Sequence, residues 1–173
     1  VGELHMGLQN FDSGGPYWQV MARWCVENDW PVNCHVTEAA GHDHPGSIPT
    51  PLQNFVRLAE SQPDLKLILA HWGGGLAFFE QNSKLREILK NVYYDCAASP
   101  LLYDMGIFKQ MVELVGIDKL FFGSDYPLRI FPSHEKSPEM MRYFRTIREE
   151  SGLCESDLCN LFGSNFARMM SLY

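Results

Sequence analysis

Short apolar runs alternate with longer amphipathic segments along most of the chain. Five runs are rich in β-forming residues, which predicts strands within residues 1–5, 31–35, 66–71, 91–95 and 119–125. Between them, apolar residues recur every three or four positions, the period of a helix that buries one face. These helical faces are marked by Trp18, Met21, Ala22, Cys25 and Val26, by Leu52, Phe55, Val56 and Ala59, and by Phe108, Met111, Val112 and Val115.

Residues typical of helix ends agree with this division. Thr50 and Ser137 each precede a proline, which predicts a capping hydroxyl before a first-turn proline. Gly116 and Gly152 follow periodic stretches, where a left-handed residue often ends a helix. A strand followed by a helix, five times over, predicts an α/β fold with a parallel sheet. No linker-like segment divides the chain, so we expect residues 1–173 to form a single domain.

The predicted strands share one feature, a polar and chemically able side chain near the carboxyl end. These side chains are His35, His71, Asp95 and Asp125, with Glu3 and His5 on the first run. In parallel β/α folds, the carboxyl ends of the strands face the shared mouth where ligands bind. Imidazoles and carboxylates that converge there predict a divalent metal or an acid–base site. Hydrogen-bonded structural residues are the alternative.

Composition narrows the classes of function. Of the 173 residues, 46% are hydrophobic and 20% charged, which is typical of a globular protein and excludes a disordered tail or a coiled coil. The net charge of −7, without a basic stripe, argues against nucleic-acid binding. No apolar run approaches the roughly 20 residues that cross a bilayer, and no signal-peptide pattern is visible, although the first residue is Val1 rather than Met. Five cysteines without a Cys-x-x-Cys pair predict reduced thiols in the cytoplasm.

Four motifs at the strand ends, together with one near the end of the chain, resemble the amidohydrolase superfamily. They are His35-Val-Thr-Glu, Ala70-His71-Trp-Gly-Gly-Gly, Tyr94-Asp95-Cys-Ala-Ala-Ser-Pro, Phe122-Gly-Ser-Asp125-Tyr-Pro and Phe162-Gly-Ser-Asn-Phe-Ala-Arg168. The resemblance runs over nearly the whole chain. It is closest to the amidohydrolase-2 group, which contains metal-dependent hydrolases and decarboxylases of the aminocarboxymuconate-semialdehyde type.

The resemblance implies a (β/α)8 barrel with one divalent metal at its mouth, usually zinc. By motif position, His35 corresponds to a metal ligand and His71 to the histidine that acts as acid or base. Asp125 corresponds to the carboxylate that binds metal and orients the attacking water. Glu3 is either a further metal ligand or a polar residue inside the barrel. Imidazole and carboxylate ligands also suit manganese or iron.

One expected feature of the family is missing from the predicted strands. The first strand of the family normally carries a His-x-His pair of metal ligands. His42 and His44 have that spacing, but they lie in a loop bounded by glycine and proline, where exposed residues are the favoured interpretation. Because a complete barrel takes about 250 residues, five β/α units predict the carboxyl-terminal five-eighths of the fold, beginning at its fourth strand.

Several neighbours of these motifs allow two interpretations. Arg129 either holds a substrate carboxylate or forms a surface salt bridge. Trp72 is a candidate substrate contact, although core packing is favoured for it and for Phe78 and Phe79. Three consecutive glycines, from Gly73 to Gly75, allow backbone N–H groups to approach an anion, with tight packing favoured instead. Asp95 either orients a metal ligand or caps a helix.

Two functions remain open from the sequence. The first is a metal-dependent enzyme that hydrolyses or non-oxidatively decarboxylates a small carboxylated, amide or lactone substrate. The second is a non-catalytic barrel fragment that associates with itself or with a missing half, because a five-stranded sheet has two open edges. A homo-oligomer is compatible with either function, and neither requires nucleic acid or a membrane.

Overall fold

The computed structural model describes residues 1–9, 12, 14–41 and 47–172. The chain forms two compact units, Val1–Tyr94 and Asp95–Tyr173, and each is described by itself. Among the described residues, no helix has both the length and the apolar character that a membrane crossing requires. The assignment of residues 1–173 to a single domain stays a prediction.

The first unit contains the parallel strands that the sequence predicts. They are β1 (Val32–Cys34), β2 (Leu67–Leu69) and β3 (Val92–Asp95). Neighbouring strands pair in parallel in the order β1-β2-β3. The strand predicted within residues 1–5 appears as one parallel bridge between Leu4 and Cys34, where Leu4 N–H donates to Asn33 O at 2.9 Å. The polar residues Glu3 and His5 are therefore fixed beside the end of β1.

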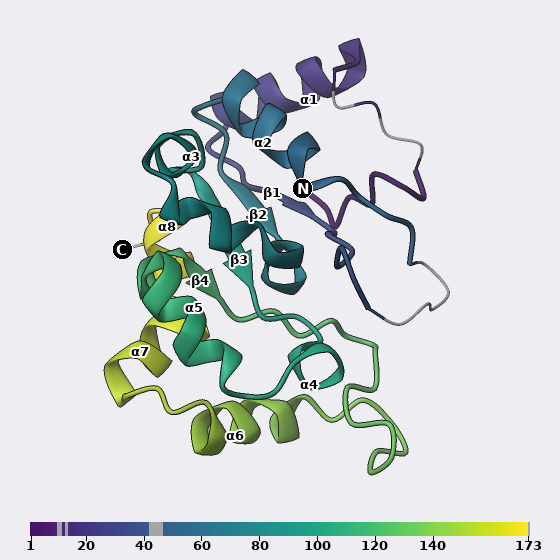
Figure 1. The fold of residues 1–173 in the computed structure, drawn as a ribbon, viewed down its shortest axis with the longest axis vertical. Helices are drawn as coiled ribbons and strands as arrows, with labels where there is room; N and C mark the ends of the chain where they lie inside the picture. Colours follow the sequence, from purple (N-terminus) through teal and green to yellow (C-terminus); the bar gives the residue numbers. More distant parts are fainter. Residues whose placement is uncertain (10–11, 13, 42–46, 173) are drawn as a thin grey trace. The chain divides into compact units, whose positions relative to one another are not determined.

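Amphipathic helices accompany these strands (Figure 1). The helical segments are α1 (Pro16–Glu27), α2 (Leu52–Ser61), the 3-10 segment η1 (His71–Gln81) and α3 (Ser83–Ile88). Helices α1 and α2 lie side by side, and Gln62 Nε2 donates to Gln19 Oε1 at 2.7 Å. The predicted inner face of α1 is confirmed, since Trp18, Ala22 and Cys25 are buried.

The predicted helix starts are wrong in detail. Thr50 does not cap a helix, because its Oγ1 accepts the N–H of buried Thr37 at 3.0 Å and thereby ties the loop to the chain after β1. Ser137 does not cap a helix either, because the helix that follows it begins only at Met140. The two predicted glycine ends are confirmed, since Gly116 and Gly152 have φ of +85° and +71°.

The second unit begins where β3 ends. Its elements are α4 (Ser99–Leu102), α5 (Ile107–Val115), η2 (Ile117–Lys119), β4 (Leu120–Phe121), α6 (Met140–Glu150), α7 (Glu155–Cys159), the π-helical turn η3 (Asn160–Ser164) and α8 (Asn165–Met169). Cys96 N–H donates to Phe121 O at 3.2 Å, which aligns the end of β3 with β4. This arrangement confirms the predicted α/β class.

The closing Phe162-to-Arg168 motif anchors the last helix to β4. Asn165 is 3% exposed, and its Nδ2 donates to Ile117 O at 2.6 Å and to Leu120 O at 2.9 Å. Arg168 donates in turn to the Asn165 side chain and to Asp118. The motif therefore has a structural role in the second unit, where β4 leads into the segment that carries Asp125.

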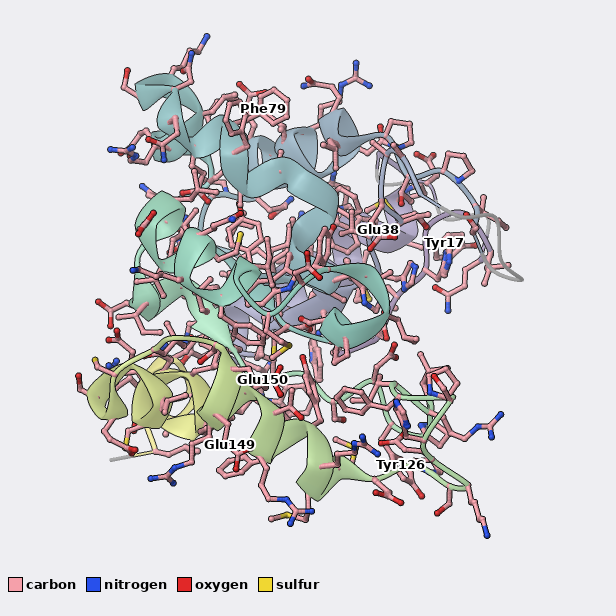
Figure 2. The ribbon with its side chains drawn as sticks, turned by 60° about the horizontal axis from the view of Figure 1, so that its bottom comes forward. Tyr17, Glu38, Phe79, Tyr126, Glu149 and Glu150 are labelled. Carbon is pink, nitrogen blue, oxygen red and sulfur yellow. The ribbon has the colours of Figure 1, made fainter. Side chains whose placement is uncertain are left out.

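Helix α1 has a second apolar stripe that faces solvent in this chain. Tyr17, Val20 and Trp24 are spaced by three and four residues, and Tyr17 is 90% exposed (Figure 2). Trp24 also contacts the exposed Trp30 edge to face, with ring centroids 4.8 Å apart. Neighbouring exposed aromatic side chains are typical of contact surfaces, and the self-association expected from the open sheet edges stays a prediction.

Thiol reactivity tests the burial of the cysteines. Cys25, Cys34 and Cys96 are buried and Cys154 and Cys159 exposed, all five being free thiols. Burial raises the pKa of Cys34 and of Cys96 to about 12, so almost no reactive thiolate is present near neutral pH. With Ellman's reagent, we expect two thiols to react quickly in the native protein and the other three only in guanidinium.

A variant with both Cys154→Ser and Cys159→Ser gives the control for that measurement. It should show no fast phase and should release three thiols on unfolding. Rapid reaction of three or more thiols in the native protein would contradict the burial of the strand and helix cysteines.

Candidate metal centre

Three side chains of the first unit bring their polar atoms together beside the strand ends. His35 Nδ1 lies 2.9 Å from Glu3 Oε1 and 3.1 Å from His71 Nε2, and His71 Nε2 lies 3.8 Å from Glu3 Oε1. Glu3 comes from the segment paired with β1, His35 follows β1 and His71 follows β2. The structure therefore brings together two of the predicted metal ligands and the predicted acid–base histidine.

The spacing of these three atoms suits a metal ion. Ligand atoms about 2.1 Å from one tetrahedral ion are about 3.4 Å apart, and the three measured separations range around that value. A proton on His35 Nδ1 can make a well-aligned hydrogen bond to only one of its two neighbours, Glu3 Oε1 or His71 Nε2. A cation would attract all three atoms. Imidazole and carboxylate together suit zinc, manganese or iron. Glu3, His35 and His71 thus fit a divalent ion.

The electrostatics of Glu3 favour cation binding as well. The hydrogen bond with His35 holds the pKa of the Glu3 carboxyl below its ordinary value. Partial burial opposes this effect, while the charges of His35, His71 and His5 act in the same direction as the hydrogen bond. Glu3 is therefore ionised at neutral pH, the state in which a carboxylate binds a metal.

His5 is a site neighbour to which the sequence analysis gave no role. Its ring stacks on His35 with centroids 4.2 Å apart and an angle of 11° between the planes. His5 Nδ1 accepts the N–H of Leu8 at 3.2 Å, which fixes the orientation of the ring. Glu3 and His5 are two residues apart on an extended segment and share one face of it, so the Glu-x-His spacing is the signal that could have identified His5.

His71 begins a left-handed turn. All five residues 71–75 have positive φ, between +55° and +95°. Left-handed backbone costs about 1–2 kcal/mol for each residue with a side chain, and His71 and Trp72 are such residues. Strain of this kind persists only when the surrounding structure enforces it, and it clusters at functional sites.

Tight packing explains two of the three glycines of this turn, as the favoured interpretation predicted. A Cβ at Gly73 would lie 2.7 Å from Tyr94 Cε1, and one at Gly74 would lie 2.8 Å from Val36 Cγ1. A Cβ at Gly75 would meet nothing within 4 Å, but its φ of +95° favours glycine. The turn therefore packs between Tyr94 at the end of β3 and Val36 in the segment after β1.

Asp125 lies in the second unit, in the segment that follows β4. Its φ is +55°, and its carbonyl accepts the N–H of Leu128 at 2.8 Å, which closes a tight turn. Tyr126 projects from this loop (Figure 2). Thus both predicted catalytic residues, His71 and Asp125, have left-handed backbone at strand ends. The approach of Asp125 to the histidines stays a prediction.

Asp95 is buried at the start of the second unit. Its Oδ1 accepts the N–H of Ala97 at 3.0 Å, which is a local turn contact. A Cβ at Gly123 would lie 2.8 Å from Asp95 Oδ1, so glycine in the Phe122-Gly-Ser-Asp125 motif makes room for this carboxylate. This contact is a turn and not a helix cap, because α4 begins at Ser99 without a side-chain cap, and the orienting role of Asp95 stays a prediction.

The remaining predicted residues are divided between surface and core. Arg129 is exposed, and its Nη1 donates to Glu135 O at 3.4 Å. Trp72 is 2% exposed, which confirms core packing, whereas Phe78 and Phe79 are 65% and 47% exposed and that prediction was wrong for them (Figure 2). They lie on the exposed side of η1, whereas Leu76 and Ala77 of the same segment are buried.

The alternative ligands His42 and His44 lie outside the described residues.

Comparisons with known proteins identify the family of the chain. Residues 4–168 match the sequence model of a family described as amidohydrolase. None of the curated proteins compared with the chain matches it.

Solved structures resemble the chain at low sequence identity. The 5-carboxyvanillate decarboxylase of Sphingomonas paucimobilis is 14% identical with a TM-score of 0.65, over 94% of this chain and 55% of that one. A dihydroxybenzoic acid decarboxylase of Polaromonas, solved with manganese and the inhibitor 2-nitroresorcinol, is 17% identical with a TM-score of 0.57, over 91% and 53%. A TIM-barrel protein of Bordetella bronchiseptica is 17% identical with a TM-score of 0.62, over 93% and 52%.

These likenesses show the fold. The chain spans about half the length of the solved structures that it matches. Together with the parallel sheet, this confirms the predicted partial TIM barrel.

Proposed function

Because this chain belongs to the amidohydrolase family, we propose that it forms part of a metal-dependent enzyme that acts on a small carboxylated molecule. The cluster of Glu3, His35 and His71 carries the proposal, since it gathers a carboxylate and two imidazoles within 4.8 Å of one another. The free cysteines support a cytoplasmic location.

Glu3 and His35 would hold the ion, and by motif position Asp125 is the third proposed ligand. A divalent ion, zinc or manganese, would neutralise a substrate carboxylate or lower the pKa of a bound water. His5 keeps the His35 ring in position by stacking. Arg129 would offer a planar guanidinium to a second anionic group of the substrate. Trp72, next to His71 in the sequence, is buried in the core.

His71 moves the proton in this proposal. Its Nε2 gives a proton to the carbon that bears the carboxylate, and the bond between that carbon and the carboxyl group then breaks to release carbon dioxide. In hydrolysis, the same Nε2 would give its proton to the leaving nitrogen or oxygen. Two of the solved structures described above are decarboxylases by name, which favours the first reaction.

The experiment that tests the proposal assays the metal-loaded full-length enzyme with hydroxylated benzoates and with amide and lactone substrates. Carbon dioxide release from a hydroxylated benzoate would support decarboxylation. Turnover of an amide or lactone alone would select hydrolysis. Absence of turnover in all assays, with stoichiometric metal bound, would favour the non-catalytic alternative.

Zinc binding by the 173-residue chain should be weak. We count two residues of the first unit, Glu3 and His35, as ligands, while the family pattern adds a His-x-His pair that no predicted strand of this sequence contains. Losing two ligands of a preorganised shell should weaken affinity by several kcal/mol. Titration of the purified chain with zinc against a chelating dye measures this.

The matched histidine variants are His35→Ala and His134→Ala. His134 is an exposed histidine that the proposal does not count among the ligands, and its variant should bind as the original chain does. His35→Ala should lose the remaining affinity. Tight stoichiometric binding by the original chain would mean that His71, or the segment with His42 and His44, completes the site.

A further inference from the structure

The left-handed turn that presents His71 requires support from its surroundings. His71 and Trp72 both have positive φ, and the turn leads directly into the rest of η1. The His71 imidazole reaches His35 with ring centroids 4.7 Å apart and an angle of 69° between the planes. A relaxed turn would carry the His71 ring away from His35, so whatever holds the turn also places the imidazole.

Tyr94 packs against this turn from β3. Tyr94 is paired with Leu69 of β2, two residues before His71. The Tyr94 ring lies so close to Gly73 that a Cβ there would be 2.7 Å from Cε1 and 2.8 Å from Cδ1. Tyr94 is fully buried. Its ring therefore forms the surface on which the turn rests.

The hydroxyl of the same tyrosine reaches the far end of η1. Tyr94 Oη donates to Glu80 Oε1 at 2.6 Å, and Glu80 is 2% exposed. Arg86 Nε donates to Glu80 O at 2.9 Å, which also fixes the backbone at this end. Burial raises the pKa of Tyr94 well above its ordinary value, and the Glu80 charge acts in the same direction, so the hydroxyl keeps its proton.

We propose that the hydrogen bond between Tyr94 and Glu80 is a clamp that holds the turn of residues 71–75 and positions His71 against His35. One side chain of β3 supports the start of η1 through its ring and the end of η1 through its hydroxyl. Tyr94 and Glu80 are positioning residues and act through His71. This inference rests on the proposed function, in which His71 moves the proton.

The test compares four single variants of the full chain. Tyr94→Phe keeps the ring and removes the hydroxyl, and Glu80→Met keeps the length and removes the acceptor. Glu80→Gln keeps an acceptor for the tyrosine and is the conservative variant. Tyr143→Phe is the matched control, because Tyr143 is another buried tyrosine whose hydroxyl donates to a carbonyl, that of Cys96 in the second unit.

One measurement follows the position of His71, and a second checks that the metal ligands are intact. The first is the nuclear Overhauser effect between the ring protons of His35 and His71 in histidine-labelled protein. The second is the affinity for Co²⁺ from its visible absorption. We expect Tyr94→Phe and Glu80→Met to lose at least half of the Overhauser intensity and to keep the Co²⁺ affinity, because His71 is not one of the proposed ligands. Glu80→Gln and Tyr143→Phe should keep both.

The double variant Tyr94→Phe/Glu80→Met should be no worse than either single variant, because both remove one hydrogen bond. If Tyr94→Phe lowers the melting temperature as Tyr143→Phe does but keeps the Overhauser effect, the bond is structural only and the proposal is wrong. If Tyr94→Phe does not fold, Glu80→Met decides by the same criterion. Failure of the original chain to bind Co²⁺ would count against the metal site, whereas the Overhauser comparison would still decide the clamp.

Discussion

Changing His71 to alanine should lower the turnover of the full-length enzyme by about 10²- to 10⁴-fold, the range typical of losing a general acid or base. Its metal content should stay unchanged, because His71 serves the proton and not the ion in the proposed mechanism. Asp125→Ala should remove metal and turnover together. Metal analysis of the purified variants, beside their steady-state kinetics, separates the two effects.

The geometry makes this comparison decisive for His71. Its Nε2 lies among the candidate ligand atoms, 3.1 Å from His35 Nδ1, so it could also bind the ion directly. Loss of metal from His71→Ala would assign it as a ligand and contradict the acid–base role. Retained metal in Asp125→Ala would exclude Asp125 from the ligands. The exposed His134→Ala should change neither quantity.

Much of the fold followed from the sequence, because strand and helix periods are local signals. The stripes of α1, α2 and α5 predict their buried faces, and the run around Leu67–Leu69 is apolar enough to predict a buried strand. Helix starts were less predictable, because a serine or threonine hydroxyl can also accept hydrogen bonds away from helix ends. The Thr50 hydroxyl serves the Thr37 N–H instead of a helix end, and this depends on a contact between distant segments.

The candidate site was predictable where strand ends carry polar residues. Glu3, His35 and His71 meet because parallel strands align their carboxyl ends, a consequence of topology that the sequence pattern already contains. The stacking of His5 and the left-handed turn after β2 could not be predicted in this way. They depend on ring orientation and on contacts between Gly73 and Tyr94, which no spacing in the sequence encodes.

Changing Asn165 to leucine should destabilise the protein by about 2–5 kcal/mol, because one buried and one half-buried carbonyl lose their donor at once and each unsatisfied group costs about 1–3 kcal/mol. The carbonyls are Ile117 O and Leu120 O, which Asn165 Nδ2 reaches at 2.6 Å and 2.9 Å. Such a loss is large against a total stability of about 5–15 kcal/mol. Urea unfolding followed by circular dichroism measures it.

Two control variants separate the buried bonds from the surface contacts of Arg168. Asn160→Ala removes a partner of Arg168 at 3.2 Å on the exposed side and should cost less than about 1 kcal/mol. Asn165→Asp keeps an acceptor for Arg168 but places a carboxylate oxygen against the two carbonyls, so it should destabilise at least as much as Asn165→Leu. An Asn165→Asp protein as stable as the original would contradict the anchoring role, because only the lost donor and the added charge distinguish it.

The loss of stability should appear mainly as faster unfolding if this anchor forms late in folding, after β4 and α8 have already met.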